Sequence, residues 1–299
     1  MDLSVVVPTL NARDQLAGCL DAIAEHVPDA EVVVVNGPSA DGTTGMVRDR
    51  EDVDVLVEVA DRRLNVARNA GIDRASGDVV ALLNYDLAVT EGWLDALAAG
   101  IDGADVVTGP TLQELTTGVA TEEVESSTVA GRSVTYFNGD NVAFRRAALD
   151  ALDGFDEYLE TGGARDAAHR LAGMDYTVAW EPEMCARRGF SADGGVTAGD
   201  LGWKYRSLAY RLAKNYGVRP TVVRRLLSHG VKDAVGALRE VAAGADPPSS
   251  WLGNGRDVLT GMARGLKDGV AARWRDRSPR RNPCGRSSRT DRAVAVYTD

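Results

Sequence analysis

The stretch DVVALLNYD at residues 78–86 decides the fold. It begins with an apolar run and ends in Asn84, Tyr85 and Asp86. A continuous run of Val, Ala and Leu without polar alternation is typical of a strand buried on both faces, as in parallel sheets covered by helices. Ligands of open α/β sheets bind at the carboxyl ends of the strands. The stretch therefore predicts a buried strand that delivers Asn84 and Asp86 to a ligand site.

Similar apolar runs recur along the first part of the chain, separated by segments with helical spacing. They predict strands at residues 3–8, 31–35, 53–59, 78–83 and 104–109, and helices at residues 13–26, 64–75 and 91–100. Short links between alternating strands and helices predict a mostly parallel sheet flanked by helices. The predicted fold class is therefore α/β.

The pattern changes after about residue 110. The later part predicts a loop or sheet edge at 111–133, strands at 134–137 and 175–181, helices at 145–152 and 164–173, and a helical region from 199 to 272 with a linker at 245–256. We therefore expect an α/β domain over residues 1–195, with halves at 1–110 and 111–195, and a helical, basic extension over 196–299.

Composition places the chain in a reducing, non-membrane compartment. No run of about 18 apolar residues predicts a membrane span, and the first residues lack the basic region of a signal peptide. Cys19, Cys185 and Cys284 are far apart and fit neither a disulfide framework nor a zinc site. We therefore expect a cytoplasmic protein.

The charge balance indicates what the protein does not bind. Formal net charge is −10, and only four of the 34 basic residues are Lys. This acidic, Lys-poor composition favours a halophile with a high-salt cytoplasm, although a GC-rich genome also replaces Lys with Arg. The acidity excludes nucleic acid as the expected partner.

Polar residues follow three of the predicted strands. They are Pro8, Thr9 and Asn11 after the first, Asn36 and Asp41 after the second, and Asn84 and Asp86 after the fourth. We expect them at one sheet edge, where amide, hydroxyl and carboxylate groups bind a base, a ribose and a metal-bridged diphosphate. Each loop alone is also explained as an ordinary turn, because Asn, Gly, Pro and Asp favour turns. The three together favour a binding site.

Longer stretches carry a family resemblance. They are SVVVPTLN at 4–11, EVVVVNGPSADGT at 31–43, LNVARNAGIDRASGDVVALLNYD at 64–86, NVAFRRAALDALDGFDE at 141–157 and RDAAHRLAGMDYTVAWEPE at 165–183. In this order the chain resembles glycosyltransferase family 2, the inverting enzymes with the GT-A fold. The resemblance covers roughly the first 190 residues. It implies a nucleotide-sugar-binding half at 1–110 and an acceptor half at 111–195.

The resemblance also implies roles for the donor site. Asn36 lies where the family usually has an Asp that reads the nucleobase, and Arg68 lies where it has an Arg near the donor phosphates. Asn84 and Asp86 occupy the Asp-X-Asp motif, so Asp86 is the expected ligand of Mg²⁺ or Mn²⁺. The two Asn residues remove two negative charges from this site.

The family places its catalytic base at the start of a helix, where Asp166 is the candidate. Arg165 replaces the usual Glu, and Arg170 follows two residues earlier than in the family. Alternatively, Asp166 is a solvated residue favoured by the helix dipole. Asp140 and Asn141, with Arg170, are the expected donor-sugar or acceptor contacts, and an ordinary turn explains the first two equally well.

These features predict an inverting glycosyltransferase. It would move a sugar from a nucleotide-diphosphate sugar to a cell-surface glycan or a polyprenyl-phosphate-linked acceptor. One alternative is a degenerate, non-catalytic protein of this fold that only binds a nucleotide or sugar, because Asn36, Asn84 and Arg165 depart from the family. Another is a sugar-phosphate nucleotidyltransferase, although the N-terminal part has no Gly-rich phosphate loop with Arg or Lys.

Two basic segments predict a further partner. Residues 203–219 interleave aromatic side chains with Lys and Arg, and residues 273–292 contain eight Arg. Both suit peripheral contact with an anionic membrane on its cytosolic face. Alternatively, 203–219 is a helix packed on the rest of the protein with its basic face in water.

Overall fold

The computed structural model describes residues 1–115, 118–120, 124–188, 201–242, 248–289 and 291–298. The chain divides into two compact units. One comprises Met1–Ser126, Thr135–Ala192 and Cys284–Asp299, and the other comprises Ser127–Val134 and Asp193–Pro283. Residues 284–299 therefore cluster with the α/β unit rather than with the helices that precede them.

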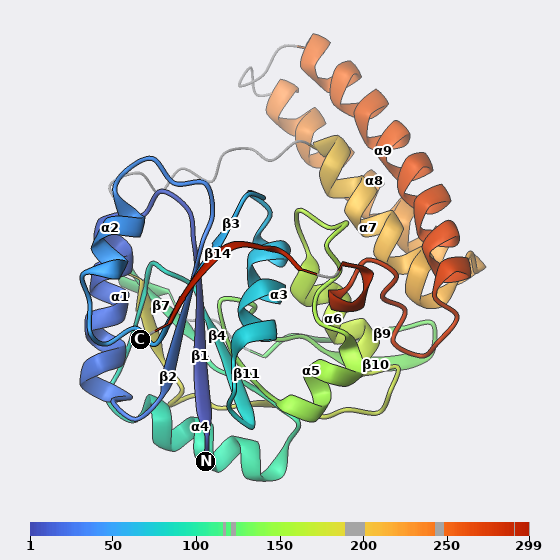
Figure 1. Cartoon of the computed structure of the whole chain (residues 1–299). Helices are drawn as coiled ribbons and strands as arrows, with labels where there is room; N and C mark the ends of the chain where they lie inside the picture. Colours follow the sequence, from blue (N-terminus) through green and yellow to red (C-terminus); the bar gives the residue numbers. More distant parts are fainter. Residues whose placement is uncertain (116–117, 121–123, 189–200, 243–247, 290, 299) are drawn as a thin grey trace. The chain divides into compact units, whose positions relative to one another are not determined.

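The first unit contains a large central sheet (Figure 1). In the described residues its strand order is β12-β6-β11-β4-β1-β2-β3-β14. The strands are β1 (Leu3–Thr9), β2 (Glu31–Asn36), β3 (Val55–Val59), β4 (Val79–Leu83), β6 (Val106–Thr108), β11 (Asn141–Arg145), β12 (Val178–Trp180) and β14 (Ala293–Thr298). Strands β4, β1, β2 and β3 are parallel, whereas β11 and β14 run antiparallel to their neighbours. The predicted α/β class and mostly parallel sheet are confirmed.

Helices cover the sheet on both faces because side chains alternate along each strand. The helices are α1 (Arg13–His26), α2 (Thr43–Arg48), α3 (Leu64–Arg74), α4 (Trp93–Gly103), α5 (Arg146–Leu152) and α6 (Gly163–Leu171). Val5 belongs to the same core as Leu16 of α1. Val6 points the other way, and a Cβ on Gly71 of α3 would lie 2.3 Å from its Cγ1. Gly71 therefore permits the close approach of α3.

Of the loop or sheet edge predicted at 111–133, the described residues are mostly strands, including the edge strand β8, rather than a loop. They form β7 (Thr111–Leu115), β8 (Gly118–Ala120), β9 (Ser126–Val129) and part of β10 (Arg132–Thr135). Strands β7 and β8 join β5 (Leu87–Val89) and β13 (Ala186–Arg188) in the order β5-β13-β7-β8. The partner strand β13 lies far away in sequence, and local composition does not reveal such pairing.

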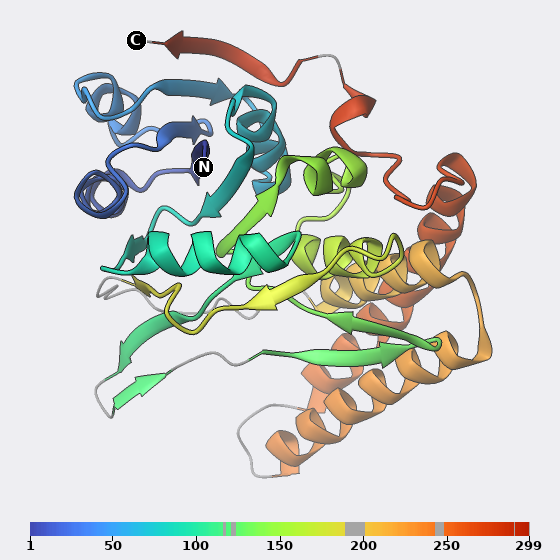
Figure 2. The same cartoon turned by 90° about the horizontal axis from the view of Figure 1, so that it is seen from below.

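Strand β14 is an element that the sequence analysis did not predict. It pairs antiparallel with β3, with Tyr297 opposite Leu56, and forms an edge of the central sheet. Figures 1 and 2 show this dark red strand beside the blue strands of the sheet. Pairing with β3 supplies hydrogen-bond partners that the β-favouring segment AVAVYT could not form locally.

The second unit contains α7 (Leu201–Tyr216), α8 (Pro220–Ala242) and α9 (Pro248–Arg275). The predicted helical region is confirmed for its described residues. The linker predicted at 245–256 is wrong from Pro248 onward, because α9 continues through that part of the chain. Residues 245–247 lie outside the described residues.

A stripe of glycines brings α9 against α7. Gly261, Gly265 and Gly269 are spaced four residues apart, so they lie on one face of the helix. A Cβ added to these residues would lie 2.1, 2.2 and 2.5 Å, respectively, from the backbone oxygens of Gly202, Arg206 and Tyr210. The two helices therefore pack closely only where α9 has no side chain.

We expect Gly265→Ala to lower the free energy of unfolding by about 1–3 kcal/mol, because the new methyl group overpacks the contact with α7. Urea denaturation followed by circular dichroism measures this change. Gly255→Ala is the matched control, because its Cβ would meet nothing within 4 Å. It should stabilise α9 by up to about 1 kcal/mol. Equal effects of the two substitutions would contradict the packing explanation.

Candidate active site

The polar ends of β1 and β2 lie side by side. Thr9 is the register partner of Asn36. Beyond the strands, the Asn11 N–H donates to Ser39 Oγ at 2.8 Å, and the Ala40 N–H donates to Asn11 Oδ1 at 2.8 Å. The first two predicted loops therefore form one hydrogen-bonded edge.

Asn36 uses its side chain within this edge. Its Nδ2 donates to Thr44 Oγ1 at 2.9 Å, and its Oδ1 accepts from Ser39 Oγ at 2.7 Å. Thr44 in turn donates to Glu58 at the end of β3. Both ends of the buried amide are engaged, so base recognition by Asn36 needs a rearrangement and stays a prediction. Sequence analysis missed Glu58, although it lies near the end of β3, opposite Asn36.

Asp41 holds the start of α2 by hydrogen bonds, although it is not the N-cap residue of that helix. The N-cap is Gly42, which has a φ of 84°. The Asp41 carboxylate accepts from the Thr43 N–H at 3.1 Å and from the Arg13 N–H at 3.0 Å. Its hydrogen bond with the Thr43 hydroxyl is the main cause that lowers the pKa of Asp41. Pro8 is buried within β1.

The third predicted loop meets charged residues from three other elements. Asp86 Oδ2 lies 2.8 Å from Arg188 Nε, and Asp140 Oδ2 lies 3.3 Å from Arg188 Nη2. Asp140 Oδ1 lies 3.4 Å from Arg68 Nη2, which also donates to the Gly139 carbonyl. The structure therefore brings Arg68, Asp86 and Asp140 together and adds Arg188. Sequence analysis missed Arg188 because strand pairing, not sequence proximity, places it there.

Burial shapes the electrostatics of this cluster. Desolvation, and then the charge of Asp140, raise the pKa of Asp86, whereas Arg188 opposes the shift. Burial lowers the pKa of Arg68, and Asp140 opposes that change. Asp86 Oδ1 and Arg68 Nε are buried without a hydrogen-bond partner, whereas Arg188 Nε faces Asp86. Buried polar groups are normally paired, so the first two atoms indicate a ligand site.

The residues present do not fit the expected Mg²⁺ or Mn²⁺ site. Within the described residues, no group of three or more His, Cys, Asp or Glu is placed to hold a metal ion. Arg188 already faces Asp86, and Asn84 Oδ1 accepts from the Tyr85 N–H at 3.0 Å. Two carboxylates and two guanidinium groups leave the cluster neutral, whereas hard cations favour several oxygen ligands with negative charge.

Asn141 does not line this site, contrary to the prediction. Its side chain is fully buried. Nδ2 donates to the Met184 carbonyl at 2.7 Å, and Oδ1 accepts from Trp93 Nε1 at 2.9 Å. Asn141 therefore ties β11 to α4 and to the chain that leads into β13. Its neighbour Asp140 is the part of the NGDN turn that reaches the charged cluster.

Asp166 lies in the first turn of α6, but it is neither solvated nor presented to a substrate. Its carboxylate has no exposed surface and forms an ion pair with Arg170 at 2.8 Å. Arg170 also donates to the carbonyl of Leu152, so it does not contact the charged cluster either. A Cβ on Gly139 would lie 2.8 Å from Ala164 Cβ. Ala164, not Asp166, is therefore the α6 residue that lies against the NGDN turn.

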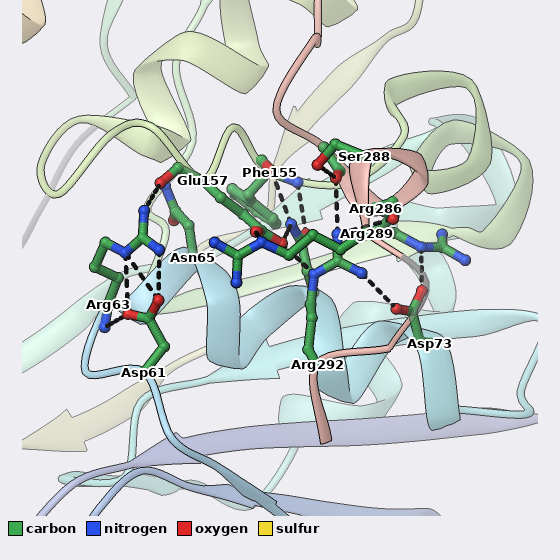
Figure 3. A network of polar contacts seen from close by, with 12 residues as sticks. Asp61, Arg63, Asn65, Asp73, Phe155, Glu157, Arg286, Ser288, Arg289 and Arg292 are labelled. Atoms are coloured by element: carbon green, nitrogen blue, oxygen red, sulfur yellow. Dashed lines mark hydrogen bonds and ion pairs between the residues drawn. The ribbon is translucent and has the colours of Figure 1, made fainter. Parts of the chain in front are cut away.

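A polar network fixes α3, the helix that carries Arg68 (Figure 3). Asn69 of α3 donates to Glu157, and buried Arg292 binds the same carboxylate from the other side. Arg292 and Arg286 also pair with Asp73 at 3.2 and 2.6 Å. These arginines belong to the segment 273–292. The predicted membrane contact of this part of the segment is therefore not supported, because Arg286 and Arg292 are paired within the α/β unit.

The structure gives no support to the predicted membrane contact through 203–219 and favours the alternative of a packed helix. In α7, Tyr205, Tyr210 and Tyr216 are buried, and Lys214 has no exposed surface. Lys204 pairs with Asp233. The tyrosines and Lys214 therefore lie on the inner face of a helix packed within its own unit, whereas Lys204 stays exposed. No helix of the described residues is long and apolar enough to cross a membrane.

Comparison with known proteins identifies the family that the N-terminal half of the chain matches. Residues 4–151 match the glycosyl transferase family 2 model. "Glycosyltransferase AglE" of Haloferax volcanii is 27% identical over 201 residues, which is 61% of this chain and 65% of that protein. The match thus covers less than two thirds of that relative. The comparisons do not establish the predicted halophilic origin.

Solved structures confirm the fold. TarS 1–349 of S. aureus, in complex with UDP-GlcNAc, has a TM-score of 0.62 at 18% identity and covers 92% of this chain and 85% of that chain. The mannosyltransferase PcManGT of Pyrobaculum calidifontis, in complex with GDP-Man and Mn²⁺, has a TM-score of 0.57 at 20% identity and covers 92% and 88%. The expected GT-A architecture is confirmed. The chain contains a glycosyl transferase family 2 domain, which extends from residue 4 to residue 151.

Proposed function

We propose that the protein transfers a sugar from a nucleotide-diphosphate sugar to a cell-surface glycan or a polyprenyl-phosphate-linked acceptor, with inversion at the anomeric carbon. The observation that carries this proposal is the convergence of Asp86, Asp140, Arg68 and Arg188 beside the ends of β4 and β11. The two guanidinium groups of that cluster, with Arg68 Nε buried and without a partner, suit a diphosphate, which offers many acceptor oxygens.

The compared proteins support a transferase over the two alternatives. TarS and PcManGT were solved with nucleotide sugars, and AglE is described as a glycosyltransferase. These proteins favour sugar transfer over nucleotidyl transfer. The second alternative, a degenerate protein that binds a nucleotide without catalysis, has to be tested by experiment, because Asn36 and Asn84 depart from the family pattern.

The structure does not favour Asp166 as the catalytic base. A general base must come within hydrogen-bond reach of the proton that it removes, whereas the Asp166 carboxylate is enclosed and paired with Arg170. We propose that Asp166 stabilises α6. A phosphate acceptor needs no strong base, which fits the polyprenyl-phosphate alternative better than a sugar hydroxyl.

A membrane-linked acceptor draws support from α8 rather than from α7. Val223, Leu227, Val231 and Val235 follow one another at four-residue spacing and are 37–62% exposed. Exposed Arg224 and Lys232 flank this stripe. A second copy docked through the same face would bring Arg224 and Lys232 against their own like charges. We propose that α8 lies on an anionic membrane surface, where apolar and cationic side chains act together.

Asp86→Ala should lower sugar transfer at least about 100-fold, because it removes the carboxylate that orients Arg188 at the diphosphate. The measurement is release of nucleoside diphosphate from a panel of nucleotide sugars with a lipid-phosphate acceptor. Asp102→Ala, an exposed change in α4, is the control. Undiminished activity in Asp86→Ala would contradict the assignment of this site. Nucleotide binding without turnover by the wild-type protein would favour the degenerate, non-catalytic binder.

Asp166→Asn should lower the free energy of unfolding by about 3–5 kcal/mol, because it leaves Arg170 buried without its counter-ion. Urea denaturation gives this value, and initial rates give the activity of the folded protein. Exposed Asp175→Asn is the control. A loss of about 10²–10⁴-fold in rate with unchanged stability would instead restore Asp166 as the base.

Arg224→Gln with Lys232→Gln should weaken binding to phosphatidylglycerol vesicles by about 30-fold, roughly fivefold for each cation. The double substitution Leu227→Ser with Val231→Ser should also weaken binding to these vesicles, because it removes two exposed apolar side chains. Vesicle flotation of the full chain measures both, with Arg13→Gln plus Arg62→Gln as the charge-matched control. Equal binding to neutral vesicles, or loss of a dimer in the Leu227/Val231 variant, would refute the membrane assignment.

A further inference from the structure

Backbone pairing sets the place of Arg188. Strand β13 pairs with β5 and β7, and this register puts Arg188 opposite Leu87, the residue after Asp86. Its guanidinium lies between the carboxylates of Asp86 and Asp140, at 2.8 and 3.3 Å. A cation shared by two carboxylates therefore already lies where the family resemblance implied a metal ion.

Arg188 has more N–H donors than its contacts with Asp86 and Asp140 use. Its Nε faces Asp86 Oδ2 at 2.8 Å, and its Nη2 faces Asp140 Oδ2 at 3.3 Å. Arg68 Nε, on the other side of Asp140, is buried without an acceptor. A guanidinium carries five N–H donors in a fixed fork. The guanidinium groups of Arg188 and Arg68 both lie beside Asp140. Together they can donate hydrogen bonds to an anionic ligand.

We propose that Arg188 supplies, in place of a divalent metal ion, the positive charge that binds the donor diphosphate and stabilises it as the leaving group. This inference deepens the proposed function and rests on it. In the transfer, the acceptor oxygen forms a bond to the anomeric carbon as the bond from that carbon to the diphosphate oxygen breaks. The diphosphate leaves with the electron pair, and any acceptor proton passes to water. Arg188 meets the charge that develops on the diphosphate.

An arginine suits this task because its charge does not depend on pH or on metal supply. Its planar fork matches phosphate oxygens two at a time. Asp86 and Asp140 hold the guanidinium in place before the donor binds, so little reorganisation is needed during the reaction. The replacement of an acid by Asn84 is consistent with this arrangement, because a site without a divalent cation needs fewer carboxylates.

The decisive measurement is calorimetric binding of UDP and GDP to the full-length protein, in EDTA and in Mn²⁺. We expect the preferred nucleotide to bind with an affinity that differs less than twofold between the two conditions. Arg188→Met should weaken its binding in EDTA by about 10- to 150-fold, the usual loss for hydrogen bonds to charged groups. Arg188→Lys, which keeps the charge but not the fork, should recover part of the loss.

Arg187→Met is the matched control, because Arg187 is the exposed neighbour on the same strand and its side chain points to the opposite face. It should leave nucleotide binding unchanged. Binding that requires Mn²⁺ would overturn the role of Arg188 and leave the proposed function intact. Absence of UDP and GDP binding in both conditions would overturn both. The comparison of EDTA with Mn²⁺ uses the wild-type protein, so it holds even if a variant fails to fold.

Discussion

The antiparallel pairing of β11 with β4 is the constraint on which the site depends. It sets Asn141 opposite Leu83, so that the Asn84 N–H donates to the Asp140 carbonyl at 2.9 Å. The buried Asn141 side chain then binds the Met184 carbonyl, which fixes the chain that enters β13. One strand register thereby brings together residues 84–86, 140 and 188, which come from widely separated parts of the sequence.

Charge balance is the second organising feature of this site. Carboxylates in a partly buried position are costly unless they are paired. Here the pairs are made with arginines from β13 and α3. The buried pair of Asp166 and Arg170 follows the same rule at α6. Several arginines, among them Arg68, Arg170 and Arg292, are thus used inside the protein.

The sequence predicted those parts of the fold that local pattern controls. Continuous apolar runs gave β1, β2 and β4, and the edge that carries Thr9, Asn36 and Asp86 followed from the parallel arrangement. Strands β7 and β14 were missed because their partners lie far away along the chain. For the same reason Arg188 was missed, while Arg68, Asp86 and Asp140 were anticipated through family resemblance.

The pattern of residue types along the sequence did not reveal which face of a helix is buried. The aromatic and basic spacing of α7 fits both a membrane surface and a packed helix, and only the glycine stripe of α9 in the structure decides between them. Asp166 shows the same difficulty at a single position. A carboxylate in the first turn of a helix is compatible with solvent, a substrate or a buried guanidinium, and sequence spacing does not distinguish these environments.

Strand β14 has a consequence for the order in which the protein is made. The ribosome synthesises residues 284–299 after the entire helical unit, yet this segment completes the sheet of the first unit and brings Arg292 to Glu157. Until it emerges, β3 is an open sheet edge, and such edges pair readily with other chains. The nascent protein therefore carries an aggregation-prone edge throughout the translation of α7, α8 and α9, and any fragment cut before residue 284 would keep it.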